Sequence, residues 1–256
     1  MSARRILALV RNEFRLIAQD PLPIMILVAF PLIMMAFLKP TFRLALLASG
    51  HPGATGAEQV VPGQAVSNGF YIVGMTSFAF FAEHGWKTWD RLRVGAGSAA
   101  DIVIGKTLPR LAVSLLQFLV LFLIGAPLEG LHSRGPLLAL IPMVVAFATC
   151  LVLLGVLVTA LCHTVQQANA VAFGGIVVFG AIGGALVPLE GLPGWAHHVA
   201  PATPTYWAMR GFRSVILSGG SIDSQLLPVV TLAAMSAGFV LVALARFRLD
   251  DAKVAF

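Results

Sequence analysis

The chain has 256 residues, of which 58% are hydrophobic and only 11% are charged, and its formal net charge is +6. Soluble domains carry about 25% charged residues, so too few charges are present here to cover the surface of a water-soluble protein of this size. The basic residues lie at the ends of apolar runs, which indicates membrane orientation rather than a nucleic-acid partner.

Residues 1–20 have the pattern of a basic amphipathic helix. The apolar side carries Ile6, Leu7, Val10, Phe14 and Ile17. The opposite side carries Arg4, Arg11, Asn12, Arg15 and Gln19. Such a helix suits the headgroup layer of a membrane, and packing on a partner protein is a compatible alternative. Asp20-Pro21 ends the pattern, and because no small-residue cleavage site follows, we expect the first apolar run to be retained.

Six apolar segments then have about the length that a helix needs to cross a bilayer, although the first two are short. They cover residues 21–38, 67–82, 107–126, 136–161, 165–189 and 225–245. None of these predicted spans contains an acidic residue. The sequence therefore predicts an all-α, polytopic membrane protein made of one transmembrane domain over residues 1–256. Cys150 and Cys162, about 18 Å apart on a single helix, are interpreted as structural thiols without a disulfide between them.

The basic residues predict the orientation of these spans. Twelve of the 17 lysines and arginines lie at the two termini or between the second and third spans, and five lie on the other side. By the positive-inside rule, both termini and the loop after the second span should be cytoplasmic. An even number of spans agrees with this arrangement.

The loop over residues 84–101 has a second amphipathic pattern. The stretch from Glu83 to Asp101 reads EHGWKTWDRLRVGAGSAAD, with a modest apolar stripe beside several charged residues. We predict a short cytoplasmic helix that could dock on a soluble partner, and a solvated loop is the alternative.

The residues from Ala100 to Thr107, ADIVIGKT, resemble a phosphate-binding P-loop only in part. A P-loop needs a glycine-rich turn between a strand and a helix, whereas bulky Ile-Val-Ile residues and an acid precede Gly105 here. No strand–helix repeat surrounds the stretch. We interpret it as the entry of the third span, with Lys106 and Arg110 on one helix face and reaching the headgroups.

Residues 190–224 form a long segment rich in proline, glycine and aromatic residues. Pro193, Pro201 and Pro204 prevent one continuous helix, while Trp195, Tyr206 and Trp207 suit a membrane interface. We expect two short helices at the outer surface that dip back toward the membrane.

The order of these features resembles the ABC-2 type exporter permeases over nearly the whole chain. Residues 83–93, EHGWKTWDRLR, are similar to the family's E-x-G-T-x-E-R-L-R stretch, with Lys87 and Asp90 as mild departures. Residues 98–106, SAADIVIGK, resemble its continuation into the third span. PLEGLPGW at 188–195 and PATPTY at 201–206 resemble the family's segment before the last span.

The resemblance implies a permease that moves an amphipathic drug-like or lipid-linked substrate outward across a bacterial plasma membrane. It implies a dimer, with a second copy or a related permease, docked on two ATPase subunits that hold ATP and magnesium. This chain would then contain no catalytic residue and no cofactor or metal site. It would have no nucleic-acid partner, and it would contact membrane lipids.

The coupling helix would include Glu83, Gly85, Trp86, Trp89, Asp90, Arg91, Leu92 and Arg93. The helix of residues 1–20, with Arg4, Arg11, Phe14 and Arg15, would add a second contact. The outer signature would include Pro188, Pro193, Trp195, Pro204 and Tyr206.

Three other classes were weighed from the residues. An intramembrane enzyme would need a serine–histidine pair, a metal motif or paired acids within the spans, and none occurs in the predicted spans. A transporter driven by an ion gradient usually carries acids or broken helices at mid-membrane. That class, and a membrane scaffold without transport, remain alternatives to the exporter permease.

Overall fold

The structure is a computed structural model of the whole chain, and it describes residues 3–86, 88–89 and 99–246. These ranges are helical with short connections and contain no strand, which confirms the all-α prediction. Six helical segments within them are long and apolar enough to cross a membrane. They cover Leu22–Ala48, Ala57–Gly85, Ala100–Leu128, Leu137–Leu161, Val165–Ile182 and Ile222–Arg246.

The chain begins with α1 (Ala3–Gln19), which turns sharply into the first span, α2 (Leu22–Ala48). The second span is built from α3 (Ala57–Gly69) and α4 (Tyr71–Gly85), and the third from α6 (Ala99–Val120), a π-helical turn (Leu121–Gly125) and α7 (Ala126–Leu128). The fourth, fifth and sixth spans contain α8 (Ile141–Leu161), α9 (Val165–Ile182) and α12 (Leu226–Arg246). Two short helices, α10 (Gly194–Val199) and α11 (Pro204–Ile216), lie between α9 and α12 in the sequence.

The first span is longer than predicted. The predicted limit was Leu38, where charged and proline residues follow, but α2 continues through Lys39 and Pro40 to Ala48. Lys39 is accommodated because its Nζ donates to the carbonyl oxygen of Glu129 at 2.6 Å and lies 3.8 Å from the carboxylate of that residue. Residues 39–66, which the predicted spans leave as a connection between them, are therefore largely helical.

The second span also begins earlier than predicted, because α3 is polar but lies inside the bundle. Every residue of α3 is buried, including Glu58 and several uncharged polar side chains. The Glu58 carboxylate accepts hydrogen bonds from the backbone N–H groups of Thr55 and Gly56, each at 3.0 Å, and so caps the start of the helix. The second span as observed therefore includes an acidic residue, Glu58, which lies outside the predicted bounds of 67–82. Polar groups are tolerated here because protein, not lipid, surrounds them.

Helix α8 lies at the centre of the bundle and packs mainly against α4 and α12. Aromatic side chains fill the space beside it, with the rings of Phe118 and Phe147 5.9 Å apart and those of Phe122 and Phe212 5.4 Å apart. By contrast, α2, α9 and α12 leave many large apolar side chains exposed, as expected for surfaces that face lipid or another subunit.

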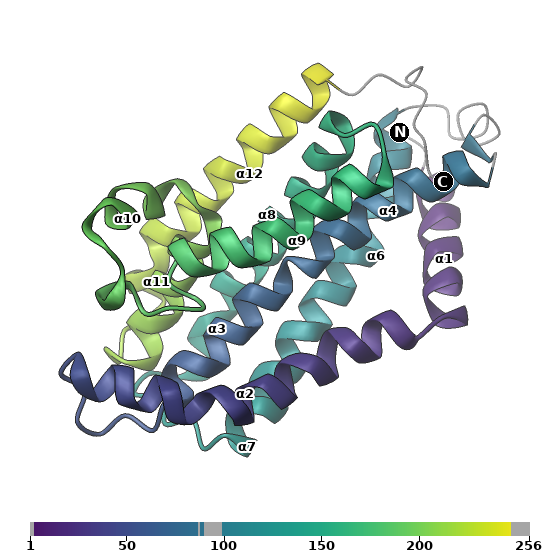
Figure 1. The fold of residues 1–256 in the computed structure, drawn as a ribbon. Coiled ribbons are helices and arrows are strands. Elements are labelled where there is room, and N and C mark those ends of the chain that lie inside the picture. Colours follow the sequence, from purple (N-terminus) through teal and green to yellow (C-terminus); the bar gives the residue numbers. More distant parts are fainter. Residues whose placement is uncertain (1–2, 87, 90–98, 247–256) are drawn as a thin grey trace.

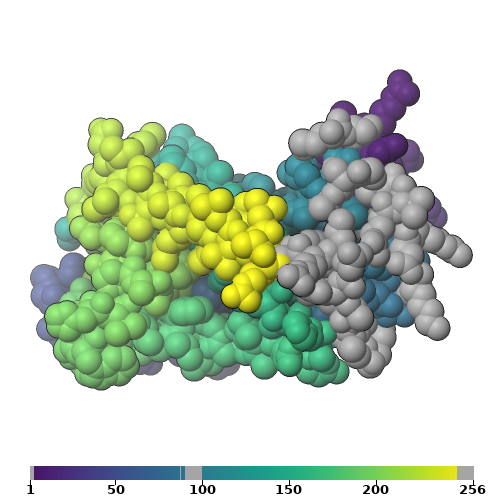
Figure 2. Space-filling model, turned by 90° about the horizontal axis from the view of Figure 1, so that it is seen from above, coloured from purple at the N-terminus to yellow at the C-terminus, as the bar shows by residue number. Residues whose placement is uncertain are grey.

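Different helices lie at the two ends of the bundle. Helix α1 lies at one end, beside the last turns of α4 and the first turns of α6, whereas α10 and α11 lie at the other end (Figure 1). Figure 2 shows the same separation from above, with α1 in purple far from the green of α10 and α11. The helix of residues 1–20 and the outer segment therefore occupy opposite ends, as the predicted orientation requires.

Candidate functional site

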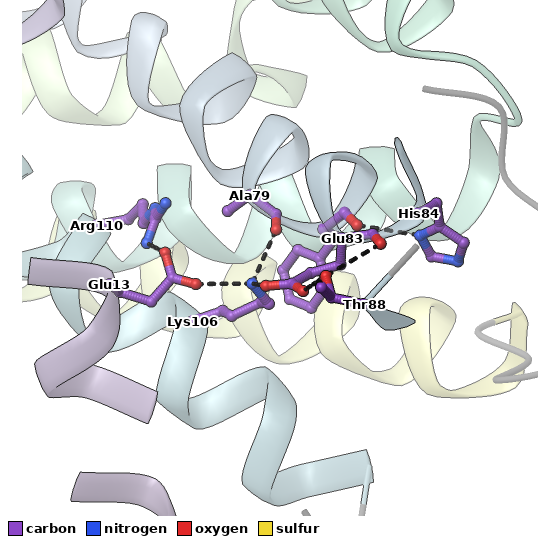
Figure 3. A network of polar contacts seen from close by, with 8 residues as sticks. Glu13, Ala79, Glu83, His84, Thr88, Lys106 and Arg110 are labelled. Atoms are coloured by element: carbon purple, nitrogen blue, oxygen red, sulfur yellow. Dashed lines mark hydrogen bonds and ion pairs between the residues drawn. The ribbon is translucent and has the colours of Figure 1, made fainter. Parts of the chain in front are cut away.

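A buried network of charged side chains joins three helices at the α1 end of the bundle (Figure 3). At its centre, the Lys106 ammonium of α6 donates to Glu13 Oε1 of α1 at 2.7 Å and to Glu83 Oε1 of α4 at 2.8 Å. It also donates to the backbone carbonyl oxygen of Ala79 at 2.9 Å. Lys106 is only 1% exposed, so these three acceptors replace water around the ammonium.

Both carboxylates have a second partner. Glu13 Oε2 accepts from Arg110, which lies one helical turn beyond Lys106 on α6. Glu83 Oε2 accepts from the hydroxyl of Thr88, and the Glu83 carbonyl oxygen accepts from the Thr88 backbone N–H at 2.9 Å. The network therefore combines two acids with two bases and ties α1, α4 and α6 together.

The start of the segment after α4 is also anchored to that helix. Besides the contacts of Thr88 with Glu83, the ring of Trp89 stacks on His84 with centroids 4.4 Å apart. Trp89 is 7% exposed and packs beside Phe80 and Ile102. Residues 88–89 therefore follow any movement of α4 closely.

This position gives a new interpretation of the ADIVIGKT stretch. All eight residues are helical within α6, so no phosphate-binding loop is formed there. Gly105 lets α1 approach, since a Cβ atom on it would lie 2.6 Å from Leu9 Cβ. The prediction that Lys106 reaches the headgroups is wrong, because its ammonium is buried against Glu13 and Glu83. Pro109 lies within α6 rather than in its first turn.

A cavity of about 550 Å³ adjoins the network. It lies between α4 and α9 and is bounded by α1 and the start of α2. Glu13, Lys106 and Arg110 contribute polar surface, but most of the lining is apolar. Among the residues that the structure describes, no group of three or more histidine, cysteine or acidic side chains could hold a metal ion.

The structure places the predicted coupling residues in different environments. Glu83 belongs to the network, Gly85 ends α4, Trp86 is 52% exposed beside the cavity and Trp89 is buried. The remaining four, Asp90, Arg91, Leu92 and Arg93, lie outside the described residues, so the coupling helix itself stays a prediction.

Helix α1 differs in one respect from the predicted amphipathic helix. Its three predicted basic residues, Arg4, Arg11 and Arg15, are exposed, as is Phe14 at 43%. The face that packs on α6 contains Glu13, which is 2% exposed and which the sequence analysis did not single out. A signal was available, because Glu13 falls at helical spacing among Ile6, Val10 and Ile17, and an acid on an apolar face needs a partner.

The outer segment is built around helix starts and one ion pair. Pro188 and Pro193 immediately precede short helices, and Pro204 is the first residue of α11, where the hydroxyl of Thr203 accepts from the Tyr206 N–H at 3.3 Å. Trp195 is 62% exposed.

The ion pair joins Glu190 to Arg213 of α11 through two hydrogen bonds, of 3.2 and 2.6 Å. Burial is the largest single effect and raises the pKa of Glu190, but the hydrogen bonds and charge of Arg213, a backbone hydrogen bond and the charge of His51 together outweigh it, so the pKa of the carboxyl lies below its usual value. The pair stabilises the outer segment, because it links the turn after α9 to α11.

Six candidate spans, with a helix packed across one end of the bundle and joined to it by buried ion pairs, define a polytopic membrane protein. The comparison with family models identifies the family. The model described as ABC-2 type transporter matches residues 4–217, and the chain therefore belongs to this family, as the motifs predicted.

Individual relatives agree with this assignment. The chain is 29% identical over 170 residues to the "Probable multidrug ABC transporter permease YbhR" of Escherichia coli. The aligned region covers 64% of this chain and 45% of the relative. It is 25% identical over 203 residues to "ABC transporter G family member 20" of Dictyostelium discoideum, covering 79% of this chain and 28% of the relative. The chain thus matches less than half the length of either relative.

Proposed function

We propose that this chain is the membrane-spanning permease subunit of an ABC exporter. It moves an amphipathic drug-like or lipid-linked substrate outward, and ATP with magnesium is bound and hydrolysed by a separate ATPase. Family membership and the names of the two relatives support the exporter class. The high apolar content of the spans favours an amphipathic substrate over an inorganic ion.

The observation that carries the proposal is the position of the ion network. The connection between α4 and α6, which contains the predicted coupling segment, follows Glu83 in the sequence and precedes Lys106, and these two flanking residues form a buried ion pair. The same ammonium holds Glu13 of α1. A force that an ATPase applies to this segment would therefore reach three helices at once.

The proposal includes an assembly and an orientation. Two permease chains, either identical or related, pair in a bacterial plasma membrane with both termini cytoplasmic, and two ATPase subunits dock on the coupling segments and on α1. The distribution of basic residues supports the orientation. The exposed basic face of α1 supports its contact with lipid headgroups or the ATPase.

The test is reconstitution of this chain with candidate ABC ATPase subunits. We expect a complex whose ATP hydrolysis depends on the permease, and Glu83→Gln should lower this stimulation severalfold while the complex still assembles. Glu129→Gln is the matched control, because Glu129 pairs with Lys39 far from the network and should leave stimulation unchanged. Robust ATP hydrolysis by this chain alone would falsify the proposal.

Crosslinking tests the docking contact directly. Trp86→Cys is the appropriate site, since Trp86 is half exposed, whereas Trp89 is buried and a cysteine there would be poorly accessible. We expect a disulfide with a cysteine placed on the ATPase surface during turnover. Failure to crosslink at any ATPase position would count against docking at this end of the bundle.

Dependence on ATP separates the proposal from an ion-gradient transporter. The buried acids Glu58 and Glu83 are held by backbone N–H groups and by Lys106, respectively, rather than being available to carry a proton or cation. Transport that continues without the ATPase and stops when the ion gradient is dissipated would favour the alternative.

A further inference from the structure

The cavity beside the ion network has the size of a small-molecule site. Its volume of about 550 Å³ falls within the range of roughly 300–1,000 Å³ that is common for ligand pockets. The walls are mainly apolar and include Ile24, Tyr71, Phe78, Phe173 and Ile176. The polar end includes Glu13, Lys106 and Arg110, and Gln19, Asp20 and Asn169 are further polar residues of the lining. An amphipathic occupant matches this division between apolar walls and a polar end.

The hydrogen bonds at the polar end indicate which kind of headgroup could bind there. The three N–H donors of Lys106 are taken by Glu13, Glu83 and Ala79, and each carboxylate oxygen of Glu13 already accepts one bond. Arg110 donates to Glu13, but its buried Nε has no acceptor among the residues that the structure describes. A guanidinium has five N–H donors, so Arg110 can accommodate a further acceptor group.

Charge favours an anion over a cation at this position. A cationic headgroup would need an available carboxylate, but Glu13 is held between Lys106 and Arg110. Asp20 lies at the exposed rim, where it accepts from the Leu22 N–H at 3.3 Å. Guanidinium groups bind carboxylates and phosphates through paired hydrogen bonds, and these are stronger than bonds to neutral acceptors.

The helices around the cavity point to the membrane as the source of the occupant. Phe78 of α4 and Phe173 of α9 line the cavity and remain 45% and 51% exposed, so the apolar wall continues to the exposed apolar surface of the bundle. We propose that the cavity binds a membrane-dissolved amphiphile with an apolar chain and one anionic headgroup, and that Arg110 binds the headgroup. This inference rests on the proposed function, because the amphiphile would then be of the substrate class that the permease exports.

Equilibrium binding to the full chain in phosphatidylcholine nanodiscs tests the inference without an ATPase. The probe is dansyl-undecanoic acid in mildly alkaline buffer, displaced by dodecanoic acid, dodecanol or dodecylamine. Dodecanoic acid should displace the probe at least about tenfold more effectively than either analogue, a difference of roughly 1.4 kcal/mol. Stronger displacement by the amine, or equal displacement by all three, would overturn the anionic assignment.

Two pairs of variants locate the site. Arg110→Gln should weaken probe binding about tenfold or more, and Arg110→Lys should weaken it less, because it keeps a charge beside Glu13 but loses the planar donors. Arg134→Gln, at an exposed position outside the cavity, should bind like the wild type. Ile176→Trp should fill the cavity from its apolar wall and block binding. Val177→Trp should not, because the neighbouring Val177 is 62% exposed and does not line the cavity.

The outcomes separate this inference from the proposed function. Unchanged binding in Arg110→Gln refutes the headgroup contact, and unchanged binding in Ile176→Trp refutes the cavity. If a second copy of the chain covers this face instead, the probe will bind only after the dimer dissociates, which also overturns the inference. In each case permease-dependent ATP hydrolysis can persist, so failure here leaves the proposed function separately testable.

Discussion

Replacing Lys106 with methionine should destabilise the folded permease by about 3–5 kcal/mol, the cost of breaking a buried ion pair from one side. The Lys106 side chain is 1% exposed and lies within 2.9 Å of three oxygen acceptors. Its loss removes the ion pair of Glu83 and leaves Glu13 paired with Arg110 among the residues that the structure describes. Methionine retains most of the volume, so the effect reports charge rather than a cavity.

The free energy of unfolding can be measured in mixed micelles by raising the mole fraction of dodecyl sulfate while helix content is followed by circular dichroism. Lys39→Met is the matched control, since Lys39 lies 3.8 Å from Glu129 with 33% of its side chain exposed, and such pairs contribute about 0–1 kcal/mol. Adding Glu83→Gln to Lys106→Met should recover part of the loss, because the remaining Glu13–Arg110 pair is balanced. The reasoning is refuted if Lys106→Met costs no more than Lys39→Met, or if the second substitution adds its full cost.

Two further substitutions test packing and pH dependence. Gly105→Ala should destabilise the fold by about 1–3 kcal/mol, because the new Cβ would meet Leu9 Cβ at 2.6 Å and displace α1. Gly174→Ala, with nothing within 4 Å of the new Cβ, should stabilise α9 by up to about 1 kcal/mol. Equal shifts of the melting temperature in detergent for the two variants would contradict this reasoning. Because the pKa of Glu190 is lowered in the fold, its pair with Arg213 stabilises the protein at neutral pH and loses this effect as pH falls through the folded pKa. Glu190→Gln should therefore reduce stability by about 0–1 kcal/mol at neutral pH, seen as a slightly lower melting temperature, and should match the wild type in acid. A difference in melting temperature that is the same at both pH values would contradict the assignment.

The fold class and the six spans could be predicted because apolar runs of this length have few other folded states. Their limits could not, because each depends on a partner distant in the sequence. The sequence predicts that the first span ends before Lys39, but Glu129, 90 residues away, provides an acceptor for this lysine. The polar residues around Glu58 fall outside the predicted spans, since sequence alone does not show that α3 is enclosed by other helices.

Three of the four charged members of the candidate site could be named from the sequence. The spacing of four places Lys106 and Arg110 on one helix face, and Glu83 belongs to the stretch that resembles the family's coupling helix. Glu13, the common partner of Lys106 and Arg110, lies 93 residues before Lys106, and no local pattern connects them. Without that partner, exposure to headgroups was the cheaper state for Lys106; with it, burial becomes the observed state.

The energetics of this network indicate how the end of the bundle should move. Two unit charges 4 Å apart attract by about 4 kcal/mol at an effective dielectric constant near 20, so separating Lys106 from Glu13 and Glu83 would absorb much of the energy available from a docking event. A rigid displacement of α1, α4 and α6 together preserves all four ionic partners and costs none of this attraction. Movement of the coupling segment should therefore carry α1 with it, and distances between spin labels on α1 and α6 should stay constant through the ATP cycle while those from α6 to α12 change.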